Sequence, residues 1–324
     1  MSTQISILGL GQIGKSFGLA LADHKGNMQR VGYDRSLEVA NQAKSLGAVD
    51  KVTFNLHDAV KGSQIVLLCL PLDEIRATLG EIIPDLQSGT LVMDTAPVKN
   101  TLLSWAQELL PAGVSYISLL PVPGIAQAES PLTARADLFQ NMPVFIVPAA
   151  GSSQNAVRFA TDIISLLGAT PLFIDAAELD GLTARTQTLP QLIATALVLA
   201  SAGQPGWFEA TKTTGLSYAA ATMPLELIQA GTLQSEATLN RTNTLRVLDD
   251  FIAAIEALRT TLFENTDDTN ALSPVFENAM QARELWWIRR STSDWETNPP
   301  PMPHPEKTNL LTRWFGLGRF FKKK

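Results

Sequence analysis

The sequence has very little of the residue types that build disulfides, metal centres and histidine-based sites. Its 324 residues include one cysteine, Cys69, and three histidines, His24, His57 and His304. A single thiol cannot close a disulfide within the chain, and cysteines cannot assemble a metal centre here, so we predict no bound metal. Cys69 lies in the apolar run Ile65–Leu70, which is typical of a buried strand. We therefore interpret it as a small core residue and not as a reactive thiol.

Long hydrophobic runs and an excess of positive charge are missing as well. No stretch reaches the roughly 18 apolar residues that a membrane-spanning helix needs. The formal net charge is −6, which argues against nucleic acid as a partner. The chain opens on a predicted strand with no signal-peptide pattern, so we expect a cytoplasmic location. The length of 324 residues is enough for two domains with cores of their own, and the hydrophobic content of 45% is that of a globular protein.

Short apolar runs alternate with helical patterns in the first half of the chain. This alternation predicts an α/β fold, in which a parallel Rossmann-type sheet at residues 1–175 is covered by helices on both faces. The expected strands are Ile5–Leu8, Val31–Tyr33, Ile65–Leu70, Thr90–Met93, Val114–Leu120, Pro143–Pro148 and Pro171–Ile174.

The second half, residues 176–290, is predicted to be an all-α helical domain. Leu189–Ala200 is apolar nearly all round, which indicates a helix buried between others, within the chain or between subunits. Apolar residues recur at three- and four-residue spacing over Asn243–Phe263, so that helix presents an apolar stripe. This is more apolar helix surface than such a half readily buries alone, so we expect a homodimer, with a self-contained helical domain as the alternative.

The last residues differ in composition from everything before them. Residues 291–306 contain five prolines and read as a stiff, extended linker. Residues 307–324 carry six basic side chains and no acidic one, with apolar residues such as Trp314 and Phe321 at helical spacing. We expect this tail to contact an anionic membrane surface or an acidic partner; docking on the acidic body of the protein, or simple solvation, remains open. A peripheral membrane contact is thus compatible with the cytoplasmic location.

A glycine-rich loop follows the first predicted strand. The segment Gly9–Gly14 has the spacing G-x-G-x-x-G, with a strand before it and a helix after it. In such a loop Gly9 permits the tight turn, Gly11 admits the pyrophosphate of a dinucleotide, and Gly14 allows close packing of helix and strand. Gln12 and Ile13 complete the loop, whose helix offers free N–H groups to phosphates.

An acidic residue at the end of the second strand supports a dinucleotide site. Asp34 stands 20 residues after Gly14, where a carboxylate accepts hydrogen bonds from ribose hydroxyls and repels a 2′-phosphate. NAD is therefore expected over NADP, although Arg35 is able to pair with a 2′-phosphate. The other residues expected to border the cofactor stand at later strand ends: Leu70, Pro71 and Asp94.

Several motifs together resemble the prephenate/arogenate dehydrogenase family of tyrosine biosynthesis, from about Ile5 to Arg290. They are GLGQIGKSFGLAL from Gly9, Asp94–Lys99 for D-x-x-S-V-K, Leu120–Gly124 for H-P-M-x-G, Leu189-Pro190 for S-H-L-P-H, and the C-terminal segments from Asn240 and Asn278. The resemblance implies a Rossmann domain followed by a helical dimerisation domain. It also implies hydride transfer from a cyclohexadienol ring to the cofactor, with decarboxylation to an aromatic product.

The departures from the family pattern concentrate at the chemistry. The family's histidine accepts the ring hydroxyl proton, and the matching residue here is Leu120, which cannot take a proton. The serine of D-x-x-S-V-K is Pro97, and the histidines that flank Leu-Pro are Thr188 and Gln191. The family's substrate arginine has no counterpart, Ser217 being the best match. The three histidines of the chain are expected on the surface, away from the site.

Two functions are compatible with this pattern. The first is an NAD-dependent dehydrogenase acting, weakly or with altered specificity, on a cyclohexadienyl or related small acid. Its replacement polar groups would be Gln187, Thr188, Gln191 and Lys99, although Lys99 is equally interpretable as a solvated surface lysine. The second is a non-catalytic NAD-binding protein that acts through its tail at a membrane or a partner.

Overall fold

The computed structural model describes residues 3–24, 26, 28–123, 133–265 and 268–293. The chain divides into two compact units, Met1–Val247 and Leu248–Lys324. The predicted tail at 307–324 and nearly all of the predicted proline linker lie outside the described residues.

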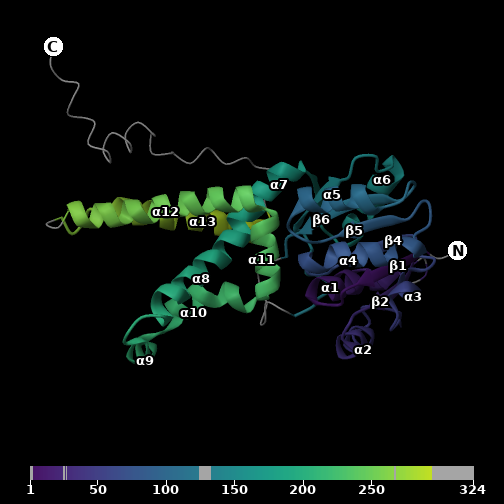
Figure 1. The fold of residues 1–324 in the computed structure, drawn as a ribbon, viewed down its shortest axis with the longest axis horizontal. Helices are drawn as coiled ribbons and strands as arrows, with labels where there is room; N and C mark the ends of the chain where they lie inside the picture. The colour runs from purple at the N-terminus through teal and green to yellow at the C-terminus, as the bar shows by residue number, and fades with distance from the viewer. Residues whose placement is uncertain (1–2, 25, 27, 124–132, 266–267, 294–324) are drawn as a thin grey trace, which may run out of the picture. The chain divides into compact units, whose positions relative to one another are not determined.

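Within the described residues, eight strands form one sheet in the order β3-β2-β1-β4-β5-β6-β7-β8 (Figure 1). The strands are β1 (Thr3–Leu8), β2 (Met28–Tyr33), β3 (Lys51–Val52), β4 (Ile65–Leu68), β5 (Leu91–Asp94), β6 (Ser115–Pro121), β7 (Pro143–Pro148) and β8 (Thr170–Phe173). The order reverses at β1, whose neighbours are β2 and β4, and such a switch point is where open α/β sheets bind ligands.

The prediction of an all-parallel sheet is wrong for one pair of strands, β6 and β7. Strands β1 to β6 are parallel neighbours, but β7 runs antiparallel to β6 and parallel to β8. Pro121 pairs with Val144, so the chain leaves β6 and re-enters at β7 at the same edge of the sheet. A buried apolar strand reads alike in both directions, and the sequence pattern therefore did not reveal the reversal.

Six helices cover the two faces of the sheet (Figure 1). Helices α1 (Gln12–Ala20), α2 (Leu37–Ser45) and α6 (Gln154–Leu166) pack on one face, and α3 (Leu56–Val60), α4 (Leu72–Ile82) and α5 (Lys99–Leu109) on the other. Strand residues alternate between the two resulting cores: Ile7 lies in one, and Leu8 in the other. The predicted Rossmann-type layering is confirmed.

The rest of the first unit is helical. It contains α7 (Ala176–Thr183), the π-helical turn η3 (Ala184–Thr188), α8 (Leu189–Ala202), α9 (Trp207–Ala210), α10 (Leu216–Thr222), α11 (Ala230–Leu239) and the first residues of α12 (Arg241–Glu264). The second unit holds the remainder of α12 and α13 (Ser273–Thr292). Among the described residues, no helix has the length and apolar character needed to cross a membrane.

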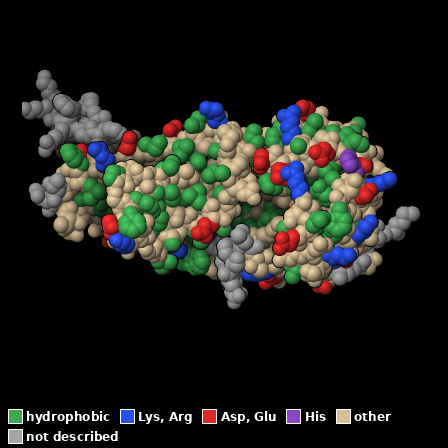
Figure 2. Space-filling view, turned by 60° about the horizontal axis from the view of Figure 1, so that its bottom comes forward, with side chains coloured by type: hydrophobic (Ala, Val, Ile, Leu, Met, Phe, Trp, Pro, Cys, Tyr) green, Lys and Arg blue, Asp and Glu red, His purple; other side chains and the backbone are tan. Residues whose placement is uncertain are grey.

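Helix α8 is not buried inside the single chain as its composition suggested. Of its residues only Ala194 is buried, and Leu199 is 70% exposed. Hydrophobic side chains are exposed over the helical part of the molecule in the space-filling view (Figure 2). Of the two burials considered for α8, packing within the chain is therefore wrong, and packing between subunits stays a prediction.

Candidate functional site

The loop after β1 is held in a conformation that requires glycine at its first position. Gly9 has a φ of 89°, and its N–H donates to the Tyr33 carbonyl at 2.9 Å. A Cβ built on Gly9 would stand 2.3 Å from the Cys69 carbonyl oxygen, and one on Gly14 would stand 2.0 Å from the Gly9 carbonyl oxygen. Both contacts are too short for any side chain, so these glycines let β1, β4 and α1 approach one another.

The space beside Gly11 is open. A Cβ built there would meet nothing within 4 Å among the described residues. Helix α1 starts at the next residue, Gln12, without a side-chain cap and without an acid in its first turn, as far as the chain is described. Its first N–H groups and the positive end of its dipole are thus available to an anion. The residues present fit a dinucleotide pyrophosphate, the group for which the sequence motif is specific.

Asp34 is fixed at the end of β2 by two backbone hydrogen bonds. Its Oδ2 accepts from Leu10 N at 2.8 Å, and its Oδ1 accepts from Ser36 N at 2.8 Å. The side chain is partly exposed. It ties the glycine-rich loop to the start of α2 and keeps free lone pairs for further donors, which suits a carboxylate that receives ribose hydroxyls.

Arg35 is engaged by an acid of a neighbouring helix. Its Nη1 lies 2.9 Å from Oε1 of Glu74 in the first turn of α4, and the Arg35 side chain is 65% exposed. A 2′-phosphate that approached Arg35 would have to compete with Glu74 and would meet the like charge of Asp34. This arrangement favours a cofactor without that phosphate.

The remaining predicted cofactor residues gather at the same edge of the sheet. Ile13 packs against the core from the first turn of α1, and the Gln12 side-chain amide donates to the Thr133 carbonyl at 3.1 Å. Leu70 and Pro71 follow β4 and lead into α4, for which Pro71 is the N-cap. The structure thus brings the loop, Asp34 and the β4 end together, as the sequence predicted. Their contact with a cofactor stays a prediction.

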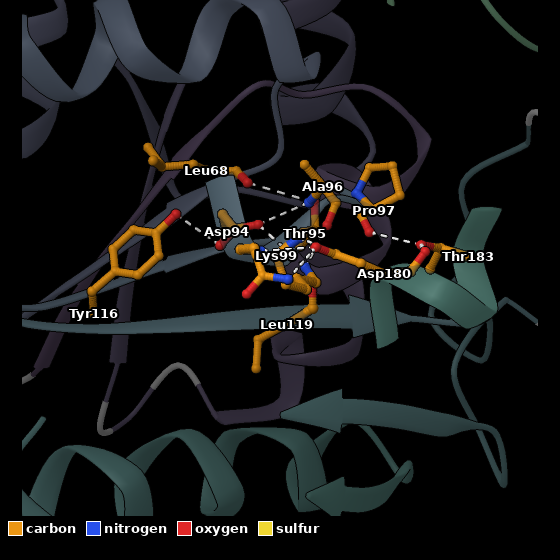
Figure 3. Close-up of polar contacts among 11 residues, drawn as sticks. Leu68, Asp94, Thr95, Ala96, Pro97, Lys99, Tyr116, Leu119, Asp180 and Thr183 are labelled. Atoms are coloured by element: carbon orange, nitrogen blue, oxygen red, sulfur yellow. Dashed lines mark hydrogen bonds and ion pairs between the residues drawn. The ribbon is translucent and has the colours of Figure 1, made fainter. Parts of the chain in front are cut away.

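Asp94 differs from the other predicted cofactor residues, because its side chain is completely buried (Figure 3). Oδ2 accepts from the Tyr116 hydroxyl at 2.8 Å, while Oδ1 accepts from Ala96 N at 2.9 Å and lies 3.5 Å from Lys99 Nζ. The carboxylate is therefore directed into the protein and does not face a ligand. The position of Asp94 at the end of a strand had suggested a contact with the cofactor. Because the carboxylate has three partners inside the protein, we instead assign it a structural role.

Lys99 is also fully buried, which overturns its interpretation as a surface lysine. Its ammonium group donates to the carbonyls of Ala96 and, at 2.7 Å, Leu119, beside Asp94 (Figure 3). Burial lowers the pKa of Lys99, and the Asp94 carboxylate opposes that shift. Burial also raises the pKa of Tyr116 well above its ordinary value, and Asp94 adds to it. Since all its donors are directed at protein oxygens, Lys99 is positioned to brace β5, β6 and α5, not to hold a substrate carboxylate.

The N-terminus of α5 is capped from a distant helix. Asp180 of α7 is buried, and its carboxylate accepts from Lys99 N at 2.5 Å and from Asn100 N at 3.1 Å. The Asp180 carbonyl accepts from Asn240 Nδ2 at 2.7 Å, and the Thr183 hydroxyl donates to the Pro97 carbonyl at 3.2 Å. These bonds fasten the helical part of the first unit to the loop after β5. Sequence reasoning missed Asp180, because its partners lie about eighty residues away in the chain.

Leu120, which the sequence resemblance matches to the family's histidine, lies in an apolar cluster. It is 5% exposed and packs with Val147, Ala176 and Leu179. Nothing in this cluster can accept a proton. The site position that the resemblance assigns to proton transfer is thus filled with hydrocarbon.

The predicted replacement polar groups lie on and beside the π-helical turn η3, which joins α7 to α8. Gln187 and Thr188 belong to this turn, and Gln191 stands in the first turn of α8. π-Helical turns are rare and frequently mark functional sites. Thr188 is buried, and the Gln191 Oε1 atom is buried without a hydrogen-bond partner among the described residues. Lys99 does not join this group.

One acid near this turn escaped the sequence reading. Glu236 of α11 is 6% exposed, and α11 packs against η3. Burial raises the pKa of Glu236 to about 7. The sequence offered one sign of its unusual position, since Glu236 is the single charged residue of the segment Ala230–Leu239.

The two histidines within the described residues lie at the surface as expected, whereas Cys69, predicted as a buried strand residue, follows the end of β4 and is only partly buried. Burial raises the pKa of the Cys69 thiol to about 12, so it stays protonated. His57 is 55% exposed and its Nδ1 lies 2.6 Å from Asp85, while His24 is partly exposed. His304 lies outside the described residues. Within the described residues, no group of three metal-ligating side chains is close enough to hold an ion.

Sequence comparison places the first domain in a known family model. Residues 17–172 match the model described as "prephenate dehydrogenase, nucleotide-binding domain". A cyclohexadienyl dehydrogenase of Zymomonas mobilis is 28% identical over 285 residues, covering 86% of this chain and 94% of that protein. A prephenate dehydrogenase of Bacillus subtilis is 25% identical over 199 residues, 61% of this chain and 53% of that protein.

Solved structures share the fold. An arogenate dehydrogenase of Synechocystis has a TM-score of 0.67 at 23% identity, covering 88% of this chain and 100% of that one. A prephenate dehydrogenase of A. aeolicus, solved with hydroxyphenyl propionate and NAD+, has a TM-score of 0.75 at 18% identity, covering 88% and 99%. At these identities the likeness establishes the fold, a mostly parallel sheet with a helical C-terminal region.

Proposed function

We propose that the chain is a member of the prephenate/arogenate dehydrogenase family and an NAD-dependent oxidoreductase acting on a cyclohexadienyl acid or a closely related small acid. The similarity to the cyclohexadienyl dehydrogenase of Z. mobilis extends over nearly the whole length of that protein. The proposed substrate class follows from these relatives, and the proposed cofactor from the site.

The observation that carries the proposal is the cradle at the glycine-rich loop. Gly9 and Gly14 are closed against backbone, Gly11 faces open space, and Asp34 is fixed beside Leu10. Such a cradle has little use in a protein that binds no dinucleotide. When bound, the nicotinamide ring of the cofactor supplies the acceptor for a hydride. The protein's own residues hold the pyrophosphate at α1 and select the unphosphorylated ribose through Asp34.

We propose further that turnover is slow compared with a histidine-bearing relative. Removal of a general base typically costs about 10²–10⁴ in rate, and Leu120 lies among apolar side chains. A Leu120→His change alone is not expected to restore a fast reaction, because a histidine there would lack polar partners. A turnover rate within the ordinary range of about 1–10³ per second would contradict slow turnover.

The test offers the purified full chain with NAD to prephenate and to arogenate. NADH formation is followed at high enzyme concentration, and calorimetry measures binding of NAD and NADP in parallel. Formation of NADH with either acid supports the proposal. Binding of NAD without oxidation of either acid would leave the second candidate, a non-catalytic NAD-binding protein, which the apolar surroundings of Leu120 favour. Failure to bind NAD would overturn both.

For the tail, residues 307–324, we propose contact with an anionic membrane surface. This rests on the sequence alone, with six basic residues beside apolar ones. Co-sedimentation with phosphatidylserine vesicles, comparing the full chain with a chain ending at Asn298, tests it. Equal binding by the two would refute the membrane contact.

A further inference from the structure

Glu236 is a buried carboxylic acid without a stabilising partner. It is 6% exposed, and its carboxyl group forms no hydrogen bond and no ion pair in the part of the chain that the structure describes. Buried carboxyl groups normally have such partners, because removing a charged or polar group from water is costly. An acid kept in this state is a candidate for a group that receives a ligand's donor.

Helix α11, which carries Glu236, contacts elements that border both the cofactor loop and the polar turn. This helix packs against α4, which starts directly after the predicted cofactor residues Leu70 and Pro71, and against the π-helical turn η3. Asn240 follows Glu236 by four residues and therefore shares its side of the helix, and Asn240 bonds the Asp180 carbonyl on α7. The side of α11 that carries Glu236 therefore leads toward α7, and α7 continues directly into η3.

A second unpartnered polar atom borders the same turn. Gln191 follows η3 in the first turn of α8, and its Oε1 is buried without a hydrogen-bond partner among the described residues. The elements that contact η3 thus carry one buried acceptor without a partner, Gln191 Oε1 on α8, and one buried carboxyl group, Glu236 on α11. Because native proteins rarely leave buried acceptors unpaired, their common need is a ligand that donates hydrogen bonds, such as a hydroxyl group.

We propose that Glu236 is the proton acceptor for the ring hydroxyl of the cyclohexadienol acid, in place of the histidine that Leu120 replaces. This inference rests on the proposed function and adds to it the residue that makes slow chemistry possible.

The proton and electrons balance in this scheme. The ring C–H bond breaks with both electrons leaving as hydride to the nicotinamide, while the hydroxyl proton passes to the Glu236 carboxylate and a C=O bond forms. The ring carboxylate then leaves as carbon dioxide, and the electrons of the broken C–C bond make the ring aromatic. The ring oxygen regains its proton from Glu236, which returns to its starting state.

The raised pKa of Glu236 suits a proton acceptor. Burial raises its pKa from 4.5 to about 7, so a useful fraction is ionised near neutral pH. Because α11 has no other titratable side chain, the charged neighbours come from the elements packed on it or hydrogen-bonded beside it. Those elements carry Asp73, Glu74, Arg76 and Glu81 of α4, Arg185 of η3, Glu178 and Asp180 of α7, and Lys99 and Glu108 of α5, but the pKa shift of Glu236 comes from burial.

The experiment compares the full-length protein with Glu236→Gln and, as a matched control, Glu226→Gln, which changes an exposed glutamate of the same helical region. We expect kcat/KM of the unaltered protein to rise with pH through about 7. Glu236→Gln is expected to lose about 10²-fold or more in kcat and the pH dependence, with unchanged affinity for NAD. Glu226→Gln should match the unaltered protein. Full activity and an unchanged pH profile in Glu236→Gln would overturn the proposal.

Two further measurements separate this inference from the proposed function. Because the folded pKa of Glu236 lies above its unfolded value, the unfolding free energy of the unaltered protein should fall from about pH 4.5 to about pH 7 relative to Glu236→Gln. Absence of that difference would refute the titration near 7.

If the protein oxidises neither acid, the proposed function fails. Binding of hydroxyphenyl propionate then tests whether Glu236 accepts a hydrogen bond from a ring hydroxyl. pH-dependent binding near 7 that Glu236→Gln lacks supports the ring-hydroxyl site, while equal binding, or none, refutes it.

Discussion

Asp34 is a side chain whose charge is already organised before a ligand arrives. Both carboxylate oxygens accept backbone N–H groups, one from the glycine-rich loop and one from the start of α2. A ribose hydroxyl therefore meets an acceptor that does not have to be reoriented. Preorganisation of this kind strengthens binding because little conformational freedom is lost on association.

Replacing Asp34 by Asn tests the selection of NAD. The change removes the charge and leaves one acceptor oxygen, so we expect NAD affinity to fall by about 10-fold or more, in line with hydrogen bonds to charged groups. NADP affinity should fall less, which narrows the preference. Calorimetry with both cofactors measures this, and Asp23→Asn, at an exposed position, is the control. Tighter binding of NADP by the unaltered protein would show that Arg35 governs the choice.

The buried pair of Lys99 and Asp94 makes a prediction about stability. Lys99→Met removes the positive charge beside the buried Asp94 carboxylate and the ammonium donor of the Leu119 carbonyl. We expect a loss of about 3–5 kcal/mol in unfolding free energy, measured by denaturant unfolding. Lys44→Met at an exposed position should change the stability by no more than about 0.5 kcal/mol.

The double variant Asp94→Asn with Lys99→Met should lose less stability than the two single changes added together. The expected coupling is about 1 kcal/mol. Additive effects would show that the two groups do not interact, in spite of their 3.5 Å separation.

At the residue scale, the sequence predicted the residues whose surroundings are formed by segments close to them in the chain. The spacing from Gly9 to Asp34 identified the cradle, since a strand, a turn and a helix follow one another within it. Lys99 and Glu236 were not predictable in the same way. Their burial depends on β6, α7 and η3, which are remote in the chain, and an isolated lysine or glutamate reads as a surface residue.

Among the elements, α5 depends on an acid that it does not itself contain. Val98, its N-cap residue, provides no side-chain bond, and Asp180 of α7 accepts from the first two N–H groups instead. Helix α7 has its own local cap, Asp175, which accepts from Ala177 N and Glu178 N. The two aspartates thus perform the same task, one across the fold and one within a turn.

This pair gives a matched comparison. Asp175→Ala should cost about 1 kcal/mol, as for a local cap, and Asp180→Ala about 2 kcal/mol or more, because it also leaves buried N–H groups and Asn100 Nδ2 unpaired. Thermal and denaturant unfolding measure both. Equal losses would show that Asp180 acts as an ordinary cap. Strand β7 illustrates the same limit. The local pattern predicted the strand, but its direction depends on the neighbouring strands β6 and β8.

For the whole molecule, exposed apolar side chains on the helical elements favour a second copy of the chain as their cover. In the first unit Leu199 is 70% exposed, Phe208 75% and Leu216 86%. We predict a homodimer, with a mass by light scattering of twice the 35.0 kDa of the chain. Phe208→Glu with Leu216→Glu should shift the mass toward that of the monomer, whereas Phe54→Glu, also exposed but on the sheet domain, should not. A monomeric mass at micromolar concentration would refute the dimer.

The hydrogen bond from the Arg135 amide to the buried Ser16 hydroxyl, 3.0 Å long, joins the returning chain before β7 to the first turns of α1. Hydrogen exchange of the Arg135 amide is consequently sensitive to ligand binding at the N-terminus of α1. Its exchange with deuterated solvent requires the bond to open, and a ligand that immobilises α1 makes opening rarer. At a ligand concentration of 100 times Kd the stabilisation amounts to about 2.7 kcal/mol, or about 100-fold slower exchange for an amide that opens with the site. Slower exchange of this amide on addition of NAD is therefore the expected sign of cofactor binding, at a backbone position outside the glycine-rich loop.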